Sequence, residues 1–253
     1  MSPGIKTAEG ADKGGTNMAK KTGDVNDPKK DNRTAHNAAD YDSKVLQTMP
    51  YYDNLHDETI NIIKASGIEI GNWLDAGSGT GTFIKKAFIG FPGASFILAD
   101  PSAEMMDRAK KNLDGLIGRF RFLPPVKAQD LRINDKCDVI TAIQSLHYSK
   151  PPEREDAVRV CYNMLNKGGL FLTTENIRPL TDEGIKIGKE NWKRFQMHKG
   201  RDEKEAAKHI GRFGVEYFPL TIEEHLKIYR DCGFKTVEMY WYSYMQAGFY
   251  CVK

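Results

Sequence analysis

The sequence predicts one α/β domain built on a mostly parallel sheet with helices on both faces. Three observations predict it. Short apolar runs alternate with amphipathic helical segments along most of the chain. Residues 73–83 read W-L-D-A-G-S-G-T-G-T-F, a strand that runs into a glycine loop and then a helix. A second apolar run ends at Asp100, 23 residues beyond Gly77, which is typical of an open α/β sheet.

Composition sets the broad class. The chain has 253 residues, of which 40% are hydrophobic and 28% charged, enough for one substantial core. The net charge is +3 with both signs interspersed, which disfavours an extended nucleic-acid surface. The four cysteines have no metal-ligand spacing, so we expect no metal site and a reducing, cytoplasmic setting. There is no apolar run of membrane length and no signal peptide, so we expect no membrane partner.

The chain divides into an extension and a domain. Residues 1–38 have almost no large apolar side chains and are predicted to be a disordered extension. Residues 39–253 form the domain. Within it, residues 178–218 interrupt the alternation of strands and helices with a helical insertion, in which Trp192 and Phe195 share a face. We expect this insertion to act as a lid that specifies the substrate.

The first part of the domain leads to the glycine loop. Residues 41–55 carry three tyrosines, including Tyr41 and Tyr52, and Pro50 breaks any helix between them. Residues 59–65 then form a helix that ends near Gly67. With its three tyrosines, the segment 41–55 is too aromatic to be a simple linker.

The glycine loop predicts a ligand site. Three glycines, Gly77, Gly79 and Gly81, permit a sharp turn and let a ligand approach the backbone. The nicotinamide dinucleotide fingerprint also requires a glycine at the sixth position, where Thr82 stands, so that interpretation is weakened. The alternative is a glycine-rich turn with no ligand.

The second and third strands add two further candidates. Residues 96–99 form a strand whose tip carries Asp100, an acid that can accept hydrogen bonds from both ribose hydroxyls of an adenosine cofactor. In the following helix Met105 faces inward, either as a core residue or as part of the site. After the third strand, residues 120–123, come Asp130 and Leu131. Asp130 is either a ligand contact or a turn residue.

The central strand brings the candidate catalytic residues. Residues 138–143 are apolar and deliver Gln144, His147 and Tyr148 to the carboxyl edge, where ligands bind in open α/β sheets. His147 has a usable pKa for a general base, although a lone histidine is more often structural. Tyr148 is a weaker candidate.

The second half completes the sheet. A helix over residues 153–165 precedes a fifth strand, residues 170–174, which ends in Glu175 at the same edge. Arg212 follows among aromatic side chains and either binds a carboxylate or pairs with Glu216. A helix over 221–232 and two strands over 237–242 and 247–252 end the chain.

The pattern Asp75-x-Gly77-x-Gly79-x-Gly81, with Asp100 after the second strand, resembles the class I S-adenosylmethionine (SAM) dependent methyltransferases. The resemblance covers roughly residues 57–253. It implies a Rossmann-like seven-stranded sheet in the order 3-2-1-4-5-7-6 and SAM as cofactor. The implied cofactor-binding residues are Tyr52, Asp75, Gly77, Gly79, Gly81, Asp100, Met105, Asp130, Leu131 and Gln144. The candidate substrate-binding residues are Tyr41, Glu175 and Arg212.

A closer resemblance links the chain to the carboxy-SAM synthase family. The segment Met49-Pro50-x-Tyr52 and the Cys232-Gly233-Phe234 triplet are similar to that family. The resemblance implies that Tyr52 reaches the cofactor and that an arginine of the insertion holds the carboxylate of carboxy-SAM. The equivalent position here is near Ile210, with Arg212 two residues away, and this departure weakens the assignment.

We therefore expect an enzyme that transfers the methyl group of SAM to a small-molecule acceptor, acting as a monomer or homodimer. A carboxy-SAM synthase-like enzyme and a non-catalytic SAM-binding sensor are the alternatives, whereas an RNA methyltransferase is disfavoured by the balanced charge. The sequence leaves the acceptor atom open among nitrogen, oxygen, sulfur and carbon. Aromatic residues near Tyr41 either indicate an apolar or aromatic acceptor or simply pack the lid.

Overall fold

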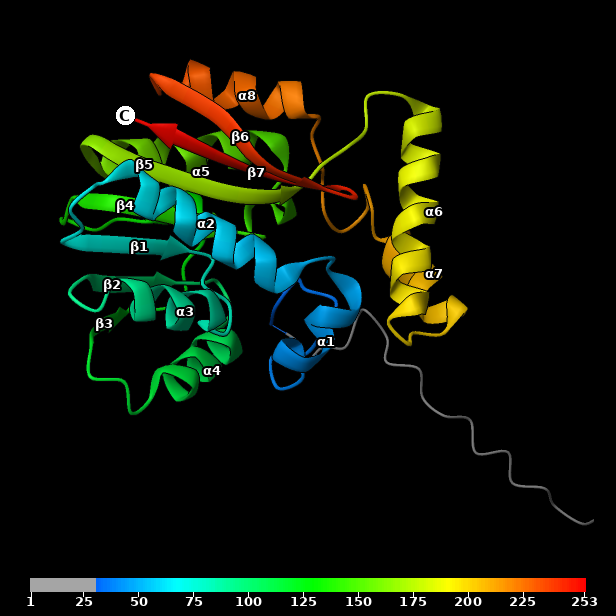
Figure 1. Ribbon diagram of the computed structural model, residues 1–253, viewed down its shortest axis with the longest axis horizontal. Coiled ribbons are helices and arrows are strands. Elements are labelled where there is room, and N and C mark those ends of the chain that lie inside the picture. Colours follow the sequence, from blue (N-terminus) through cyan, green and yellow to red (C-terminus); the bar gives the residue numbers. More distant parts are fainter. Residues whose placement is uncertain (1–30) are drawn as a thin grey trace, which may run out of the picture. The chain divides into compact units, whose positions relative to one another are not determined.

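The computed structural model describes residues 31–253 (Figure 1). Of the extension predicted over residues 1–38, residues 1–30 lie outside the described part. Residues 31–38 contact the domain, since Asp31 accepts a hydrogen bond from Ser102 at 2.5 Å. The described residues form one compact unit.

A seven-stranded sheet organises this unit, and its order is β3-β2-β1-β4-β5-β7-β6, as predicted. Only β7 runs antiparallel to its neighbours, β5 and β6. The strands are β1 (Asn72–Ala76), β2 (Ser95–Ala99), β3 (Arg119–Phe122), β4 (Cys137–Ile143), β5 (Leu165–Asn176), β6 (Thr236–Ser243) and β7 (Gln246–Val252). The predicted fifth strand began at residue 170, whereas β5 begins at Leu165 because Leu165 already pairs with Cys137 of β4.

Helices cover both faces of the sheet, which confirms the predicted layering. On one face Ile60, Ile84 and Ala109 pack against the sheet, from α2, α3 and α4. On the other face Ala157 and Ile228 pack from α5 and α8. These helices are α2 (Tyr52–Ser66), α3 (Thr82–Gly90), α4 (Ala103–Leu113), α5 (Pro151–Met164) and α8 (Ile222–Asp231).

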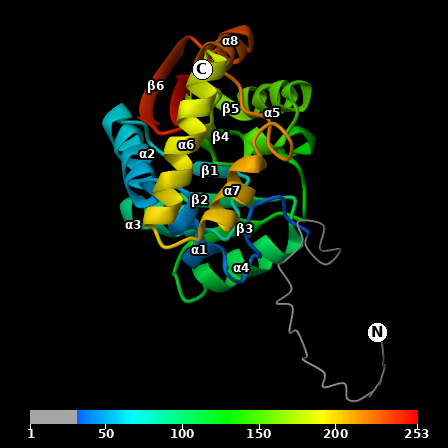
Figure 2. The same ribbon diagram turned by 90° about the vertical axis from the view of Figure 1, so that its right-hand side faces the viewer.

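Three further helices lie beyond the carboxyl ends of the parallel strands, namely α1 (Tyr41–Thr48), α6 (Asp182–His198) and α7 (Glu203–Gly211) (Figures 1 and 2). The helices α6 and α7 belong to the predicted insertion. Trp192 and Ile210 pack there with Met245 from the β6–β7 turn. The indole of Trp192 donates a hydrogen bond to the carbonyl of Thr48 at 2.7 Å. This contact joins the insertion to α1, so both cover the edge at which ligands bind in this fold.

None of the helices in residues 31–253 combines the length and apolar character needed to cross a membrane. The same residues contain no cluster of three or more side chains suited to hold a metal ion.

Candidate functional site

A cavity of about 390 Å³ opens at the carboxyl edge of β1, β2 and β4. This volume falls in the range of small-molecule sites. The glycine loop forms one wall, and the segment from Asp31 to Thr34 forms another. Tyr41, Tyr52, Met105, Gln144 and Tyr148, all candidate site residues of the sequence, also line it. We call it the cofactor cavity.

The glycine loop is shaped by its backbone. Gly77 and Gly79 have φ angles of 95° and 52°, which glycine adopts without strain. A side chain at Gly77 would lie 2.3 Å from Cβ of Ser145, whereas a Cβ at Gly79 would meet nothing within 4 Å. Gly79 therefore leaves its backbone open to a ligand. Gly81 is not in the cavity wall, because it packs against Ala109, 3.2 Å from an added Cβ.

Asp75 places a buried carboxyl group next to the loop. Thr141 donates a hydrogen bond to Oδ1 of Asp75 at 2.7 Å and accepts one from the indole of Trp73 at 2.9 Å. Asp75 is only 1% exposed, and burial raises its pKa to about 7. It makes no ion pair in residues 31–253. Because a buried carboxylate is stabilised by a nearby cation, Asp75 fits the ammonium group of SAM.

Asp100 stands at the tip of β2 with both carboxylate oxygens oriented by the backbone. It accepts hydrogen bonds from the N–H groups of Gly79 and Ser102, each at 2.9 Å. Burial raises its pKa to about 6, although these two bonds oppose the rise. Each oxygen keeps a further lone pair for the ribose hydroxyls of an adenosine cofactor. The acceptor capacity of Asp100 therefore fits the ribose of SAM.

The helix α1 fastens the glycine loop through Asp42, a residue that the sequence analysis did not single out. Oδ1 of Asp42 accepts hydrogen bonds from the hydroxyls of Thr80 at 2.5 Å and Thr82 at 2.9 Å. Its other oxygen accepts one from the amide of Asn112 at 3.1 Å. No local pattern pairs Asp42 with a loop 38 residues away, so only the fold reveals the contact.

A second, smaller cavity of about 50 Å³ adjoins the first. Tyr41, Gln144 and Tyr148 line both cavities. The remaining wall comes from residues 34–36, α1, the short helix η2 (Leu146–Tyr148), β5 and the insertion, with His147, Asn176, Trp192, His209, Arg212 and Tyr217 among its residues. Gln144 has a φ of 52°, a conformation that non-glycine residues rarely adopt. Such strain is typical of functional sites. We call this space the acceptor cavity.

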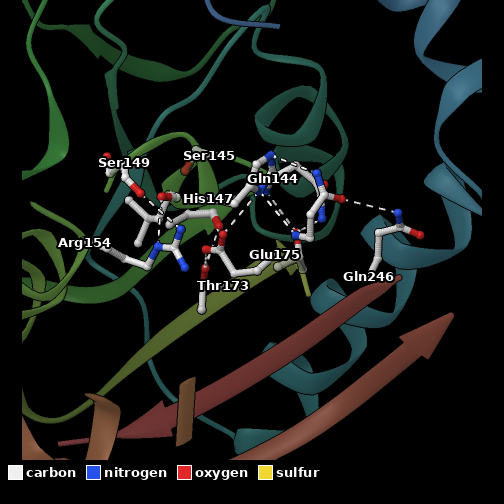
Figure 3. Close-up of polar contacts among 12 residues, drawn as sticks. Gln144, Ser145, His147, Ser149, Arg154, Thr173, Glu175 and Gln246 are labelled. Atoms are coloured by element: carbon white, nitrogen blue, oxygen red, sulfur yellow. Dashed lines mark hydrogen bonds and ion pairs between the residues drawn. The ribbon is translucent and has the colours of Figure 1, made fainter. Parts of the chain in front are cut away.

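A buried polar network holds His147 in the wall of the acceptor cavity (Figure 3). Its Nδ1 lies 3.3 Å from Oε2 of Glu175, and its Nε2 lies 3.2 Å from the amide nitrogen of Asn176. Thr173 donates to the other oxygen of Glu175 at 2.5 Å, and Gln246 donates to Asn176 at 3.3 Å. The backbone N–H of Asn176 also points at Nδ1, with 3.3 Å between the two nitrogens. With Glu175 ionised and the proton of the neutral imidazole on Nδ1, the lone pair of Nε2 accepts from the amide of Asn176.

The charges of this network agree with that protonation. Burial lowers the pKa of His147, and the contact with Glu175 only partly opposes the change. Burial alone would raise the pKa of Glu175. The nearby His147 and Arg154 outweigh this effect and bring the pKa of the carboxyl below its ordinary value. The pair therefore consists of a neutral imidazole and a carboxylate, which suits a general base.

Arg154 fixes the segment that carries His147. Its guanidinium is 1% exposed and donates to the carbonyls of Leu146 and Ser149, each at 3.1 Å, and to that of Phe218 at 2.5 Å. The sequence analysis missed this residue. The available signal was the position of Arg154 on the inward face of an amphipathic helix. A buried arginine needs several hydrogen-bond acceptors, so that position indicates a residue that fixes nearby backbone.

Arg212 contributes a cation to the acceptor cavity, but its charge is largely balanced. Nε donates to Glu216 at 2.6 Å, and a terminal nitrogen donates to the carbonyl of Arg33 at 2.5 Å. The guanidinium also lies 5.8 Å from the ring centre of Tyr217. The structure thus contains the predicted pair with Glu216 and also places Arg212 in the acceptor cavity.

Four of the predicted site residues lie elsewhere than expected. Asp130 is exposed and outside both cavity walls, whereas its neighbours Ala128 and Gln129 line the cofactor cavity, because the short helix η1 (Ala128–Asp130) turns Asp130 outward. Leu131 is 2% exposed and belongs to the hydrophobic core. Gly81 serves packing, and Glu175 lies behind His147 instead of in the wall.

Comparisons with known proteins agree with this geometry. Residues 74–171 match the family model described as a methyltransferase domain. The carboxy-S-adenosyl-L-methionine synthase of Staphylococcus epidermidis is 24% identical over 214 residues, which cover 84% of this chain and 91% of that protein. Seven further curated relatives at 22–33% identity carry the same name.

Two solved structures share the fold. Magnesium protoporphyrin IX methyltransferase from Synechocystis, solved with S-adenosylhomocysteine (SAH), has a TM-score of 0.57 and 18% identity, covering 80% of this chain and 83% of that chain. Human N-acetylserotonin methyltransferase, solved with SAM, has a TM-score of 0.58 and 15% identity over 85% of this chain. This chain spans 58% of the length of the human enzyme.

The fold is therefore that of the class I SAM-dependent methyltransferases, and residues 74–171 match a methyltransferase-domain model. The matched domain and the carboxy-SAM synthases among the sequence relatives indicate a SAM-dependent enzyme.

Proposed function

We propose that this protein transfers the methyl group of SAM to a hydroxyl or amine of a small molecule bound in the acceptor cavity. The observation that carries the proposal is the neutral His147, held by the buried carboxylate of Glu175 in the wall of a cavity that adjoins the cofactor cavity. An oxygen or nitrogen nucleophile loses a proton as it accepts a methyl group, so a positioned base assists the reaction.

SAM, when bound, supplies an activated methyl group and its own leaving group. The protein contributes binding, orientation and the exclusion of water. Asp75 would hold the ammonium group and Asp100 the ribose, which fixes the direction of the cofactor along the edge of the sheet. Tyr148 and Gln144 line both cavities and would orient the acceptor toward the methyl group. Nε2 of His147 would receive the proton after the acceptor displaces the amide of Asn176 from it, while Glu175 stabilises the resulting imidazolium.

The acceptor cavity, at about 50 Å³, would hold only the reacting group of the acceptor, and its lining is partly aromatic. Tyr41, Trp192 and Tyr217 contribute aromatic surface, and Asn176 and Arg212 contribute polar groups. The insertion over residues 178–218 would act as the lid. The four cysteines are all free, which supports a cytoplasmic, reducing compartment. A monomer or homodimer, without a nucleic-acid or membrane partner, completes the proposal.

The first test is to release and weigh any nucleoside that copurifies with the protein, and then to screen hydroxyl and amine acceptors with SAM. We expect SAM or SAH to be released, and SAH and a methylated acceptor to form together. The His147→Gln variant should bind SAM with unchanged affinity but form product much more slowly. Turnover by His147→Gln at the full rate would contradict the assignment of the base.

A carboxy-SAM synthase-like activity is the second candidate. The names of the curated relatives favour it, as does the position of Arg212 in the acceptor cavity, where a guanidinium could bind a carboxylate. The ion pair between Arg212 and Glu216 weighs against it, because the charge is already balanced. Release of a nucleoside heavier than SAM by one carboxylate group would favour this candidate over methyl transfer.

A further inference from the structure

His56 of α2 lies in the wall of the cofactor cavity and has no assigned role. Its side chain is 1% exposed, and neither ring nitrogen has a hydrogen-bond partner within residues 31–253. Burial lowers its pKa to about 3, and the nearby charge of Lys86 adds to the change. The ligand-free protein therefore carries a neutral imidazole with one N–H donor and one lone pair, both unused.

An unpartnered polar group in the interior is costly, so such groups commonly mark a site that a ligand completes. The matched case in this chain is His225, which is 0% exposed and also has an unpartnered Nε2, but lies in neither cavity wall. Its other nitrogen is 3.2 Å from the hydroxyl of Tyr229. His56 differs because both nitrogens lack a partner and because a ligand cavity lies beside it.

The position of His56 relative to Asp75 indicates which part of SAM it would meet. Trp73 and Asp75 are two residues apart on β1, so their side chains lie on the same face of the sheet. The ring of Phe83 contacts both Trp73, at 6.1 Å between ring centres, and His56, at 5.2 Å. His56 therefore lies over the face that carries Asp75, while Asp100 belongs to the neighbouring strand β2.

No hydrogen bond or ion pair joins His56 to Asp75 directly, although both side chains are described and both line the same cavity. The methionine part of SAM has two charged groups on one carbon atom, an ammonium and a carboxylate. Asp75 suits the ammonium. The carboxylate must then lie within a few bond lengths of it, and a buried imidazole N–H is a suitable donor for that group.

We propose that His56 binds the α-carboxylate of the methionine moiety of SAM by donating a hydrogen bond from its imidazole. The inference deepens the proposed function, because it rests on SAM binding in the cofactor cavity. His56 is a cofactor-binding residue in this assignment and not a base, since it does not line the acceptor cavity. Together with Asp75 it forms a pair that recognises a free amino acid group.

The test compares SAM with decarboxylated SAM, which keeps the ammonium and the sulfonium but lacks the carboxylate. Isothermal titration calorimetry gives the dissociation constant of each ligand for the wild-type protein, His56→Phe, His56→Gln and the control His225→Gln. We expect the wild-type protein and the control to prefer SAM by about 10- to 100-fold, the value of a charge-assisted hydrogen bond. His56→Phe should lose this preference, and His56→Gln should keep part of it because its amide is also a donor.

The comparison is made on one protein sample at a time, so a partly unfolded fraction weakens both ligands equally and leaves their ratio unchanged. Equal affinity of the wild-type protein for both ligands would overturn the inference and leave SAM binding intact. An unchanged preference in His56→Phe would also overturn it. If the wild-type protein binds neither nucleoside, the SAM-dependent function itself fails, and the inference fails with it.

Discussion

The two cavities of this protein are built in different ways. The cofactor cavity is framed by the ends of three adjacent strands and by the backbone of one glycine loop, so its main residues follow short patterns. The acceptor cavity is assembled from residues that are far apart in the sequence, from Thr34 in the segment before α1 to Tyr217 after α7. The first depends on local structure and the second on tertiary packing, so changes in each should affect different measurable quantities.

The largest effect is expected at the boundary of the acceptor cavity. His147→Gln should lower kcat by about 10²- to 10⁴-fold, the usual contribution of a general base, and leave the dissociation constant of SAM unchanged. Steady-state kinetics with an identified acceptor and calorimetry with SAM separate the two quantities. His198→Gln, an exposed change on α6, serves as the control. Equal losses of kcat and of SAM affinity would remove the distinction between the cavities.

A large effect is also expected at Asp75. Asp75→Asn should weaken SAM binding by about 30- to 5000-fold, since removing one partner of a buried charge pair costs about 2–5 kcal/mol. The KM of the acceptor should change little. Asp138→Asn is a suitable control, because Asp138 accepts hydrogen bonds from Gly71 and Asn72 away from both cavities. Undiminished SAM affinity in Asp75→Asn would show that another group binds the ammonium.

The pH dependence gives an independent measurement at the same residue. Burial raises the pKa of Asp75 from 3.8 to about 7, so the ligand-free fold retains a proton that the unfolded chain loses. The associated stability is fully present at pH values below 3.8 and is lost as the pH rises through 7. SAM should therefore bind more tightly as the pH rises through 7, with a larger increase in melting temperature. Asp75→Asn should flatten both curves, measured by calorimetry and thermal denaturation.

An intermediate effect is expected at Arg212. Arg212→Met should raise the KM of an anionic acceptor by about tenfold, which corresponds to one charged contact, without changing SAM affinity. Glu216→Gln should act in the opposite direction, because it frees the guanidinium from its partner. The readout is a full set of acceptor and SAM titrations. If both substitutions leave the acceptor KM unchanged, Arg212 is structural.

The smallest effect is expected where α1 meets the glycine loop. Asp42→Ala and Thr80→Val each remove a hydrogen bond from this contact and should weaken SAM binding several-fold. In a double-mutant cycle their coupling energy should be about 0.5–1.5 kcal/mol, the usual net value of a hydrogen bond. Additive effects would mean that Asp42 does not support the loop.

Much of the fold followed from the sequence because it depends on periodic patterns. The strands and the helices on both faces were predicted from those patterns, the order of the strands was implied by the resemblance to class I methyltransferases, and Pro50 separates α1 from α2 as expected. Asp75, Gly79 and Asp100 were found because a strand end, a loop and an acid follow one another at fixed intervals.

The remainder could not be predicted because it depends on long-range contacts. Asp42 reaches the glycine loop across 38 residues, and Arg154 reaches Phe218 across 64. Asp130 and Gln129 are adjacent in the sequence, and only the turn of η1 decides which of them faces the cavity. His56 is one apolar-face position in an amphipathic helix, and nothing in its spacing distinguishes a ligand contact from a core residue.

The two adjacent residues Tyr41 and Asp42 give α1 a role in cooperativity. Asp42 is bonded to the glycine loop, and Tyr41 lies in the walls of both cavities, so filling either cavity restrains the same helix. Thermodynamic linkage then requires reciprocity. Whatever factor bound SAM contributes to the affinity for the acceptor, the acceptor contributes the same factor to the affinity for SAM.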